Sequence, residues 1–506
     1  MSAYRLERGT PVAVIGAGSM GAGIAQLAAQ SGHPVRLFDR QPGACNGALK
    51  RIDADLAVAV QRGRLDAAGR DAVMARLAIV EGIHALEGCT LAVEAIVEQL
   101  EPKRALFREL EGVLGPEAVL ATNTSSISIT AIAQGLARPE RVVGWHFFNP
   151  PTRMKLVEVI PGVETDRALV AAVHALSKAW GKTSVDAPNA PGFIVNRVAR
   201  PYYAESLRLL AERVAAPEAI DRLLREAGGF ALGPFELIDL IGADVNLSVT
   251  ESVFAATGWD TRYAPHVIQQ ELVRAGRFGR KTGRGFYAYG DGARPPRAAG
   301  VRPAEDEPGA APLSSATQRG LLELLVARLS GAGVAVASDA SLHAETLAIG
   351  RDHVAMTDGR TLAERRRGGG PSVLLDLACD YSTTPVVGAT GDRDSLARLA
   401  AVLKAGGIEV IALDDVAGLV VMRTVCCLAN EAADVLTWSG VRAADIDTSM
   451  KLGTAYPLGP LAWADALGAD RVCRVLEHLH HHYGETRYRR SPALTRAHHR
   501  GEKFHG

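Results

Sequence analysis

The chain contains, close to its beginning, the stretch Pro11-Val-Ala-Val-Ile15-Gly16-Ala-Gly18-Ser-Met-Gly21, and this stretch decides how the first part folds. A short apolar run typical of a buried strand leads directly into a glycine-rich turn. An alanine-rich helical pattern continues from the turn to about Ser31, and a second apolar run, Val35–Asp39, follows it. This order of strand, turn, helix and strand predicts the first unit of a parallel sheet.

The glycine turn and Asp39 together form a candidate dinucleotide site. The first glycine permits the tight turn, the second lets the backbone approach a pyrophosphate, and the third lets the helix pack close to the sheet. The helix N-terminus then offers free N–H groups to phosphate. Asp39 can accept hydrogen bonds from ribose hydroxyls and would repel a 2′-phosphate, so we expect NAD rather than NADP, although Arg40 could pair with such a phosphate. The expected cofactor contacts here are Gly16, Gly18, Ser19, Met20, Gly21 and Asp39.

Length and composition indicate a globular chain of several domains. Its 506 residues exceed one ordinary core, so we expect roughly three or four domains. Basic and acidic residues both number 56, and this zero net charge argues against a nucleic-acid partner or a membrane surface. The six cysteines form no CxxC pair and the first residues lack a signal-peptide pattern, so we expect a cytoplasmic protein. Residues 9–35 lack charge, but their glycines, prolines and polar residues favour strand, turn and helix over a membrane span.

The pattern along the chain predicts five segments. Short strands are expected at 77–80, 91–95, 118–122, 142–146 and 155–160, with a helical stretch at 46–76. This alternation predicts a parallel sheet covered on both faces. The segments are an α/β Rossmann-type domain at 1–188, an all-α domain at 189–290, a Pro/Ala/Gly-rich linker at 291–316, a degenerate α/β segment at 317–416 and a second all-α domain at 417–506.

An internal repeat supports two helical domains of common origin. Residues Gly192–Asp244 align without gaps on Gly418–Asp470 at a constant offset of 226, with 14 of 53 positions identical. The identities include Arg197/Arg423, Glu205/Glu431, Asp221/Asp447 and the Leu-Gly-Pro of 232–234 and 458–460. Two copies this far apart predict a duplicated domain rather than a repeat array.

Four further motifs follow the glycine turn in order along the chain. They are Asn123-Thr-Ser-Ser126, His146-Phe-Phe-Asn-Pro150, Met154-Lys-Leu-Val-Glu-Val159 and Pro191-Gly-Phe-Ile-Val-Asn-Arg197. Together with Gly-Pro-Phe-Glu at 233–236 and Lys281-Thr-Gly-Arg-Gly-Phe-Tyr287, they resemble the 3-hydroxyacyl-CoA dehydrogenase family over about residues 10–290. The resemblance implies NAD-dependent oxidation of an (S)-3-hydroxyacyl-CoA to a 3-oxoacyl-CoA.

The chemistry of this oxidation explains the residue types. A base must take the hydroxyl proton, and His146 is the natural base because histidine changes charge near neutral pH. Glu158 would orient the imidazole and stabilise the imidazolium that forms. Ser125 and Asn196 offer neutral polar groups for the substrate oxygen. The resemblance implies the same four roles.

The resemblance also implies contacts to the cofactor and to CoA. Glu98, Lys103, Asn123 and Lys281 are expected to contact NAD. The helical stretch 46–76 lies where the family places its CoA contacts, and its Lys50, Arg51, Arg62 and Arg64 could meet the nucleotide phosphates of CoA. The expected substrate contacts are Lys50 and Arg62, with Ser125. Asp55 departs from the small hydroxyl residue that family members carry there, which puts the CoA contacts in doubt.

The second half lacks the catalytic residues of the first. The counterpart of Asn196 is Met422, and 317–416 contains no GxGxxG, so we interpret this segment as a truncated relic that binds no dinucleotide. Short family members dimerise through the helical domain. We therefore expect an intrachain pseudo-dimer of the two helical domains, with a homo-oligomer as a further expectation. The histidine-rich C-terminus, including His478 and His482, is interpreted as a solvated helix end, and no metal site is expected.

The sequence leaves several functions open. The long form resembles the bacterial branch used in phenylacetate breakdown, which implies 3-hydroxyadipyl-CoA as the substrate. Oxidation of 3-hydroxybutyryl-CoA or of general fatty-acid β-oxidation intermediates is the alternative. A free ω-carboxylate needs a cation, for which Arg153, Arg197 and Arg200 are candidates. A β-hydroxyacid dehydrogenase would use a catalytic lysine rather than His146, and a structural protein on the same fold is the alternative outside enzymes.

Overall fold

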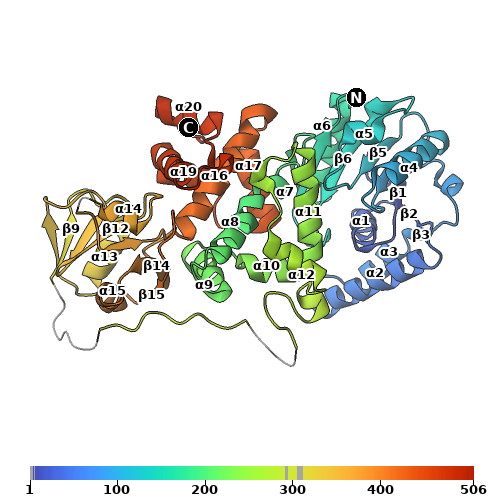
Figure 1. The fold of residues 1–506 in the computed structure, drawn as a ribbon. Coiled ribbons are helices and arrows are strands. Elements are labelled where there is room, and N and C mark those ends of the chain that lie inside the picture. The colour runs from blue at the N-terminus through green and yellow to red at the C-terminus, as the bar shows by residue number, and fades with distance from the viewer. Residues whose placement is uncertain (1–3, 5, 291–294, 305–311, 368) are drawn as a thin grey trace. The chain divides into compact units, whose positions relative to one another are not determined.

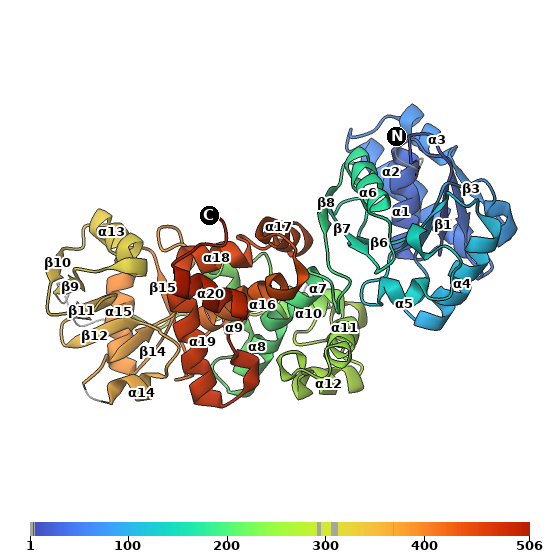
Figure 2. The ribbon, with the colours of Figure 1, turned by 90° about the horizontal axis from the view of Figure 1, so that it is seen from above.

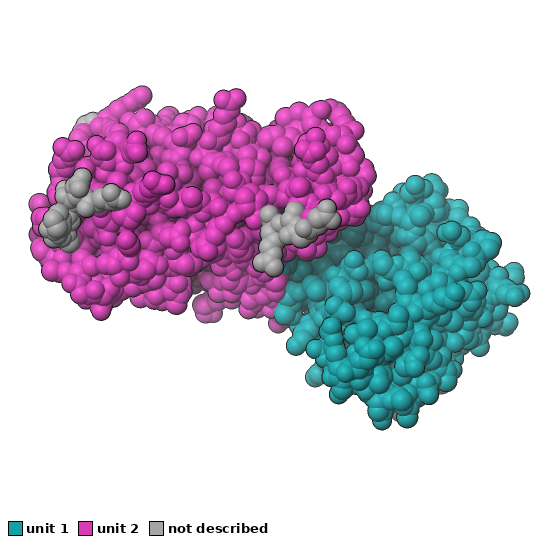
Figure 3. Space-filling view, turned by 90° about the horizontal axis from the view of Figure 1, so that it is seen from below, with its two compact units in different colours: residues 1–196, 452–454 teal, residues 197–451, 455–506 magenta. Residues whose placement is uncertain are grey.

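The computed structural model describes the whole chain except residues 1–3, 5, 291–294, 305–311 and 368. It divides into two compact units, which Figure 3 shows in different colours. Unit 1 is Met1–Asn196 with Leu452–Thr454, and unit 2 is Arg197–Lys451 with Ala455–Gly506. The division falls within the short helix α7 (Val195–Val198).

Unit 1 contains one sheet, whose strand order in the described residues is β3-β2-β1-β4-β5-β6-β7-β8. The strands are β1 (Val12–Ile15), β2 (Val35–Phe38), β3 (Leu77–Ile79), β4 (Leu91–Glu94), β5 (Val119–Thr122), β6 (Val142–Phe147), β7 (Leu156–Pro161) and β8 (Thr183–Asp186). Neighbouring strands are parallel except β6 and β7, which are antiparallel. The expectation of an all-parallel sheet is therefore wrong at β7. The edge strand β8 was missed because its residues are largely polar and only partly buried.

Helices cover both faces of this sheet, with α1, α2 and α6 on one face and α4 and α5 on the other (Figures 1 and 2). The helices are α1 (Ser19–Gln30), α2 (Ala44–Gln61), α3 (Ala67–Met74), α4 (Leu100–Val113), α5 (Ile129–Ala133) and α6 (Arg167–Ala179), with 3-10 turns η1 (Ile83–Leu86) and η2 (Pro139–Arg141). The stretch 46–76, predicted as helical, forms the two helices α2 and α3.

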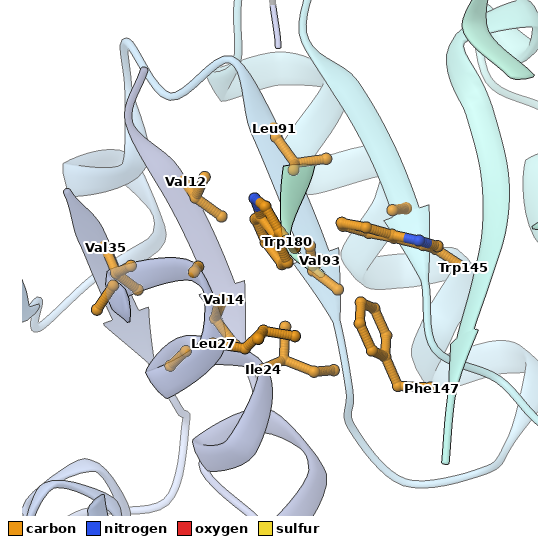
Figure 4. Close-up of a cluster of buried hydrophobic side chains, with 14 of the residues drawn as sticks. Val12, Val14, Ile24, Leu27, Val35, Leu91, Val93, Trp145, Phe147 and Trp180 are labelled. Atoms are coloured by element: carbon orange, nitrogen blue, oxygen red, sulfur yellow. The ribbon is translucent and has the colours of Figure 1, made fainter. Parts of the chain in front are cut away.

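The core of unit 1 explains why residues 9–35 lack charge. Strand β1 is completely buried, and eight residues of α1 are buried against it. Figure 4 shows Val12, Val14, Ile24 and Leu27 gathered with the aromatic rings of β6 and with Trp180, which directly follows α6. The indole of Trp145 lies 4.9 Å from that of Trp180, ring centre to ring centre. The uncharged stretch is thus a buried strand and helix, as predicted.

Unit 2 carries both helical copies. The first comprises the C-terminal end of α7, α8 (Arg200–Ala211), α9 (Pro217–Arg222), a π-helical turn η3 (Leu223–Ala227), α10 (Pro234–Ile241), α11 (Ala243–Ala256), η4 (Thr261–Tyr263), α12 (Val267–Arg274) and η5 (Arg280–Thr282). The second comprises α16 (Val421–Ser439), α17 (Ala443–Thr454), α18 (Pro460–Leu467), α19 (Ala469–Tyr483), η7 (Thr486–Tyr488) and α20 (Pro492–Arg500), although the last three residues of α17 belong to unit 1.

The sequence repeat is also a repeat of helix capping. Asp221 accepts hydrogen bonds from two backbone amides at the start of α10, at 2.9 and 3.0 Å. Asp447 accepts two at the start of α18, both at 2.9 Å. A Cβ on Gly233 or Gly459 would lie 2.3 or 2.0 Å from atoms of these aspartates. The repeated Leu-Gly-Pro therefore keeps the glycine that gives each aspartate access to its helix.

A second sheet lies in unit 2, and its strand order in the described residues is β10-β9-β11-β12-β13-β14-β15. The elements are β9 (Leu313–Ala316), η6 (Gly320–Leu322), α13 (Glu323–Gly331), β10 (Val336–Asp339), β11 (Thr346–Ile349), β12 (Asp352–Met356), α14 (Leu362–Arg366), β13 (Val373–Leu375), β14 (Val386–Gly391), α15 (Arg393–Ala405) and β15 (Glu409–Ala412). Strand β9 lies inside the predicted linker 291–316, so that part of the prediction is wrong. Residues 291–294 and 305–311 of the linker are outside the described residues.

The last part of the second sheet repeats the last part of the first. Helix α15 and strand β15 lie 226 residues after α6 and β8, the offset of the helical repeat. Strand β14 is parallel to β15 and places Gly388 opposite Ile411, as β7 places Glu158 opposite Val185. The duplication therefore includes the end of the Rossmann sheet as well as the helical domain.

The two helical copies meet within unit 2 through reciprocal ion pairs. Arg197 Nε lies 2.8 Å from Glu431 Oε1, and Arg423 Nε lies 2.7 Å from Glu205 Oε2. The two arginines occupy equivalent positions of the repeat, and so do the two glutamates. All four side chains are buried, and α8 lies beside α16 (Figure 1). Each copy thus presents the same charged pair to the other.

Candidate active site

The predicted site residues of unit 1 gather at the carboxyl edge of its sheet, where open α/β sheets bind ligands. Gly16 follows β1, Asp39 follows β2, Asn123 follows β5, and His146 is the penultimate residue of β6. Ser19 and Met20 are the first residues of α1.

The glycine turn has the geometry that a dinucleotide requires. Gly16 has a φ of +104°, and a Cβ there would lie 2.4 Å from the carbonyl oxygen of Ala95. A Cβ on Gly21 would lie 1.8 Å from the carbonyl oxygen of Gly16, so glycine lets α1 start close to the strand. A Cβ on Gly18 would meet nothing within 4 Å. The backbone at Gly18 therefore borders open space at a helix N-terminus, where a pyrophosphate fits.

Asp39 lies beside this turn on the wall of a cavity of about 580 Å³. Its carboxylate accepts hydrogen bonds from the backbone amides of Ala17, at 2.7 Å, and Gln41, at 2.8 Å. Arg40 also lines the cavity, but its guanidinium donates to Glu109 of α4 at 2.5 Å. The carboxylate of Asp39 fits a dinucleotide with a free 2′-hydroxyl. Because Arg40 already pairs with Glu109, the structure argues against the pairing of Arg40 with a 2′-phosphate that the sequence left open.

His146 and Glu158 form a buried pair across β6 and β7. They stand opposite each other in the antiparallel ladder, and Nδ1 of His146 lies 2.7 Å from Oε2 of Glu158. The side chains are 7% and 1% exposed. The other oxygen of Glu158 accepts the backbone amides of Ile194 and Val195 at 3.1 and 3.0 Å. The carboxylate is therefore fixed on one side by a helix N-terminus and fixes the imidazole on the other.

Asn123 and Ser125 lie on the loop after β5. The side-chain oxygen of Asn123 accepts the backbone amide of Phe147 at 2.8 Å, which ties this loop to the strand of His146. Ser125 is half-buried and donates from its amide and its hydroxyl to Glu98 Oε1, at 2.8 and 3.1 Å. The structure thus joins Glu98 to the predicted substrate residue Ser125.

Lys103 is more deeply placed than a surface cofactor contact. It is 1% exposed, and its ammonium lies 2.5 Å from Glu94 and 3.3 Å from Glu98. Glu94 is completely buried and was missed by the sequence analysis. Its position as the last residue of an apolar strand, at the ligand-binding edge, was the available signal.

Asn196 and Lys281 are placed separately. Asn196 is half-buried in α7 and directly follows the amides that Glu158 binds. Lys281 belongs to unit 2, where its ammonium lies 2.6 Å from Asp244. Its expected contact with the cofactor stays a prediction.

The predicted CoA contacts lie along α2. Lys50 is exposed on this helix, and Arg62 is exposed at its C-terminal end. Asp55, the residue that departs from the family pattern, accepts from Gln26 at 2.9 Å and lies 3.6 Å from Arg153. Of the candidate partners for an ω-carboxylate, Arg197 and Arg200 are buried, whereas the side chain of Arg153 is 68% exposed.

Comparison with known proteins assigns both halves of the chain. Residues 11–190 match the 3-hydroxyacyl-CoA dehydrogenase NAD binding domain, and residues 192–289 and 418–503 match the 3-hydroxyacyl-CoA dehydrogenase C-terminal domain. The 3-hydroxyadipyl-CoA dehydrogenase of Escherichia coli (strain K12) is 43% identical over 479 residues, which cover 94% of this chain and 95% of the relative. The chain belongs to the 3-hydroxyacyl-CoA dehydrogenase family.

Further relatives of this dehydrogenase agree with that assignment. A solved 3-hydroxybutyryl-CoA dehydrogenase from Escherichia coli K12 has a TM-score of 0.88 and 41% identity, covering 97% of this chain and 98% of that one. The probable 3-hydroxybutyryl-CoA dehydrogenase of Bacillus subtilis (strain 168) is 40% identical over 278 residues, which are 55% of this chain and 96% of the relative. The predicted family, fold class, NAD dependence and reaction class are therefore confirmed. The chain is an NAD-dependent oxidoreductase of 3-hydroxyacyl-CoA thioesters.

The second sheet of this dehydrogenase matches a reduced Rossmann fold. Residues 354–416 correspond to the family's 3-hydroxybutyryl-CoA dehydrogenase reduced Rossmann-fold domain. In this second sheet, Gly388 occupies the register position that Glu158 occupies in the first. The residue opposite Gly388 on the neighbouring strand is Asp376, which therefore occupies the position of His146. Asp376 accepts the amides of Val420 and Val421, which are the counterparts of Ile194 and Val195. One aspartate thus replaces the histidine–glutamate pair and keeps only its contact with the helix.

Among the described residues, no group of three or more histidine, cysteine, aspartate or glutamate side chains is arranged to hold a metal ion. None of the helices in the described part of the chain is both long and apolar enough to span a bilayer. All six cysteines are free thiols.

Proposed function

We propose that His146 is the base of this dehydrogenase and that Glu158 orients it. The observation that carries the proposal is the buried 2.7 Å contact between Nδ1 of His146 and Glu158 at the carboxyl edge of the sheet. Because Glu158 engages Nδ1, the nitrogen left for the hydroxyl proton of the substrate is Nε2. The carboxylate also favours the imidazolium that forms when the proton arrives.

Ser125 and Asn196 are proposed to hold the substrate oxygen as it changes from hydroxyl to carbonyl. Both are half-buried polar residues. Ser125 is bonded to Glu98, and Asn196 directly follows Val195, whose amide donates to Glu158. The cavity beside Gly16, Gly18 and Asp39 would hold the dinucleotide, with Ser19 and Met20 at the start of α1. NAD, when bound, supplies the acceptor for the hydride from the same carbon. The chain itself holds and moves the proton.

The test is an assay of NADH formation with wild type and His146→Ala. We expect His146→Ala to lower kcat by roughly 10²-fold or more while NADH binding, followed by fluorescence, stays nearly intact. An unchanged turnover rate would show that His146 is not the base.

We propose 3-hydroxyadipyl-CoA as the substrate, with 3-hydroxybutyryl-CoA as the second candidate. The first is supported by the name of the relative that matches almost the whole chain, and the second by that of the solved structure of similar coverage. The exposed Arg153 supports the first, because a terminal carboxylate needs an accessible cation. Comparison of kcat/KM for the two thioesters, and for longer 3-hydroxyacyl-CoA substrates, decides between them.

The expected CoA contacts, domain limits and location stay proposals. Lys50 and Arg62 are exposed on one helix, which supports a role in binding the CoA phosphates. The division into five segments at 1–188, 189–290, 291–316, 317–416 and 417–506 is kept, with the last part of the linker reassigned to β9. A cytoplasmic location is supported by the cysteine pattern.

The intrachain pseudo-dimer is likewise a proposal. It is supported by the reciprocal pairs of Arg197 with Glu431 and of Arg423 with Glu205. The hydroxyls of Thr261 and Thr486 lie 3.2 Å apart, within the Thr-Arg-Tyr sequences of the two copies. Self-complementary contacts of this kind are those of a two-fold symmetric dimer.

A further inference from the structure

A buried charged cluster lies under the loop of Ser125, between the end of β4 and helix α4. Glu94, the last residue of β4, is 0% exposed, and Lys103 of α4 is 1% exposed. Oε1 of Glu94 accepts the Lys103 ammonium at 2.5 Å and the backbone amide of Ile96 at 2.7 Å. Two buried ions of opposite charge in this geometry are costly to separate, because either one alone would be unpaired inside the protein.

Glu98 connects this cluster to the loop. Its Oε2 lies 3.3 Å from the Lys103 ammonium. Its Oε1 receives the hydroxyl of Thr124 at 2.7 Å, the amide and hydroxyl of Ser125 at 2.8 and 3.1 Å, and the amide and hydroxyl of Ser126 at 3.1 and 3.0 Å. One carboxylate oxygen therefore organises three consecutive residues of the loop.

A second route joins Glu94 to the same loop. The hydroxyl of Thr122 donates to Oε2 of Glu94 at 2.6 Å and accepts the backbone amide of Thr124 at 3.1 Å. Thr122 is completely buried at the end of β5. Glu94 is thus connected to the loop by two routes, one through Thr122 and the other through Lys103 and Glu98.

We propose that Glu94 and Lys103 are positioning residues for the oxidation, which hold Ser125 through Glu98 in the place where it meets the substrate oxygen. The proposal rests on the proposed role of Ser125. It explains why a lysine and a glutamate, which are costly to bury, stand together with Glu98 behind an uncharged serine loop. It also explains why Lys103 is buried away from solvent.

The charge of Lys103 keeps Glu98 able to accept these hydrogen bonds. Burial alone would raise the pKa of Glu98, but Lys103 and the donors on Thr124, Ser125 and Ser126 outweigh it and hold the pKa below its ordinary value. Removal of the ammonium leaves the buried carboxylate of Glu94 and the 38% exposed side chain of Glu98 without the cation between them, which favours protonation of one of them. A protonated Glu98 would no longer serve all of its donors, so Ser125 would be released as the pH falls.

The experiment compares Lys103→Met and Glu94→Gln with Glu101→Gln as a matched control. Glu101 lies on the same helix, but its side chain is 73% exposed and pairs with Arg104. For each folded variant we measure the thermal midpoint, kcat, KM for the thioester, and the pH profile of kcat/KM. We expect kcat/KM of Lys103→Met to fall roughly 10- to 100-fold, as for a displaced contact, and its acid limb to move to higher pH. The control should match wild type.

Provided that the wild-type enzyme oxidises the thioester, either of two results would overturn the inference. One is a folded Lys103→Met with an unchanged kcat/KM. The other is an equal loss at every pH with an unmoved acid limb, which would mark a purely structural pair. If both buried-charge variants fail to fold, Thr122→Val replaces them, since it keeps the shape and cuts the second route. We then expect a several-fold higher KM for the thioester, and an unchanged KM contradicts the inference. Failure of wild type to oxidise any thioester would instead count against the proposed function.

Discussion

At the scale of single residues, the site depends on what each atom of Glu158 is bonded to. One oxygen takes two backbone amides and the other takes the imidazole of His146. A carboxylate that is held from behind can fix the ring and its tautomer, whereas a free surface glutamate would rotate. The proposed role of His146 as the base therefore depends on the start of the helical segment as well as on its own strand.

Glu158→Gln tests this dependence. The amide side chain can still accept the two backbone N–H groups, but its NH₂ would then face Nδ1 and force the ring into the tautomer with a protonated Nε2. We expect kcat to fall roughly 10²- to 10⁴-fold with little change in the thermal midpoint. Glu164→Gln, an exposed position on the loop after β7, is the control and should retain full activity. A fully active Glu158→Gln enzyme would contradict the role of the pair.

Arg153→Ala tests the recognition of a terminal carboxylate. Arg153 is the accessible member of the three arginine candidates, since Arg197 and Arg200 are buried. We expect kcat/KM for 3-hydroxyadipyl-CoA to fall about tenfold and that for 3-hydroxybutyryl-CoA to stay the same, because only the first carries the charge. Equal losses for both substrates would remove Arg153 from substrate selection. Arg108→Ala, exposed on α4, is the control.

The residues that sequence could find differ physically from those it missed. His146, Glu158, Ser125 and Asn196 stand in motifs whose residue types have a direct chemical purpose. Glu94 acts through Lys103 and Glu98, and its partners are set by the approach of α4 to the strand ends. The position of Glu94 at the end of an apolar strand indicates the ligand-binding edge, but its pairing with Lys103 depends on three-dimensional placement and leaves no local sign in the sequence.

At the scale of elements, different glycines of the turn between β1 and α1 are expected to serve cofactor binding and folding. Gly18 has an extended backbone, with φ −65° and ψ −172°, and open space where a Cβ would stand. We expect Gly18→Ala to keep the thermal midpoint of wild type and to bind NADH at least tenfold more weakly, because the methyl group would occupy the path of the pyrophosphate. Gly21→Ala should instead lower the midpoint, since its Cβ would overlap the carbonyl oxygen of Gly16. Titration of NADH fluorescence with parallel thermal unfolding checks both, and unweakened binding by Gly18→Ala would remove Gly18 from the site.

The central strands of the first sheet could be predicted because they are buried on both faces and therefore read as apolar runs; they are β1, β4, β5, β6 and β7. Direction could not, since an antiparallel strand such as β7 has the same apolar pattern as a parallel one. The onset of β9 was hidden for another reason. Its sequence, Leu-Ser-Ser-Ala, follows a stretch rich in proline and alanine and is no more apolar than its surroundings. Burial by neighbouring strands, rather than composition, makes it a strand.

At the scale of the whole molecule, the second copy keeps the helix-capping contacts of the first copy but lacks the proposed catalytic residues. Asp447 and Gly459 still cap a helix as Asp221 and Gly233 do. In place of the proposed catalytic pair, Asp376 alone binds the start of α16, and burial raises its pKa to about 6. Helix α16 in turn carries Glu431, which reaches the first copy. In the second copy, the strand position that holds His146 in the first thus carries a residue that fixes a helix of the contact between the copies.

Arg423→Met measures how strongly the two copies are joined. Arg423 is completely buried and bonds to Glu205, Glu212, Tyr483 and Tyr488. Removal of one partner from a buried pair typically costs about 3–5 kcal/mol, because the remaining charge is left unpaired. We expect a loss of that size in the free energy of unfolding of unit 2 by urea. Arg442→Met, whose side chain is 78% exposed, should cost little, and a similar small loss for Arg423→Met would contradict the proposed interface.

Expression of residues 1–290 alone tests whether the second copy is needed. In the full chain Glu431 receives both Arg197 and Arg262, at 2.8 and 2.9 Å, and all three side chains are buried. The fragment loses Glu431 and exposes the apolar surface of α8, so two arginines must either meet water or find the same glutamate position, Glu205, in a second fragment. We expect the fragment to dimerise or aggregate, as measured by light scattering on a sizing column. A stable monomer with full activity would show that the fused copy has a purpose other than completing this interface.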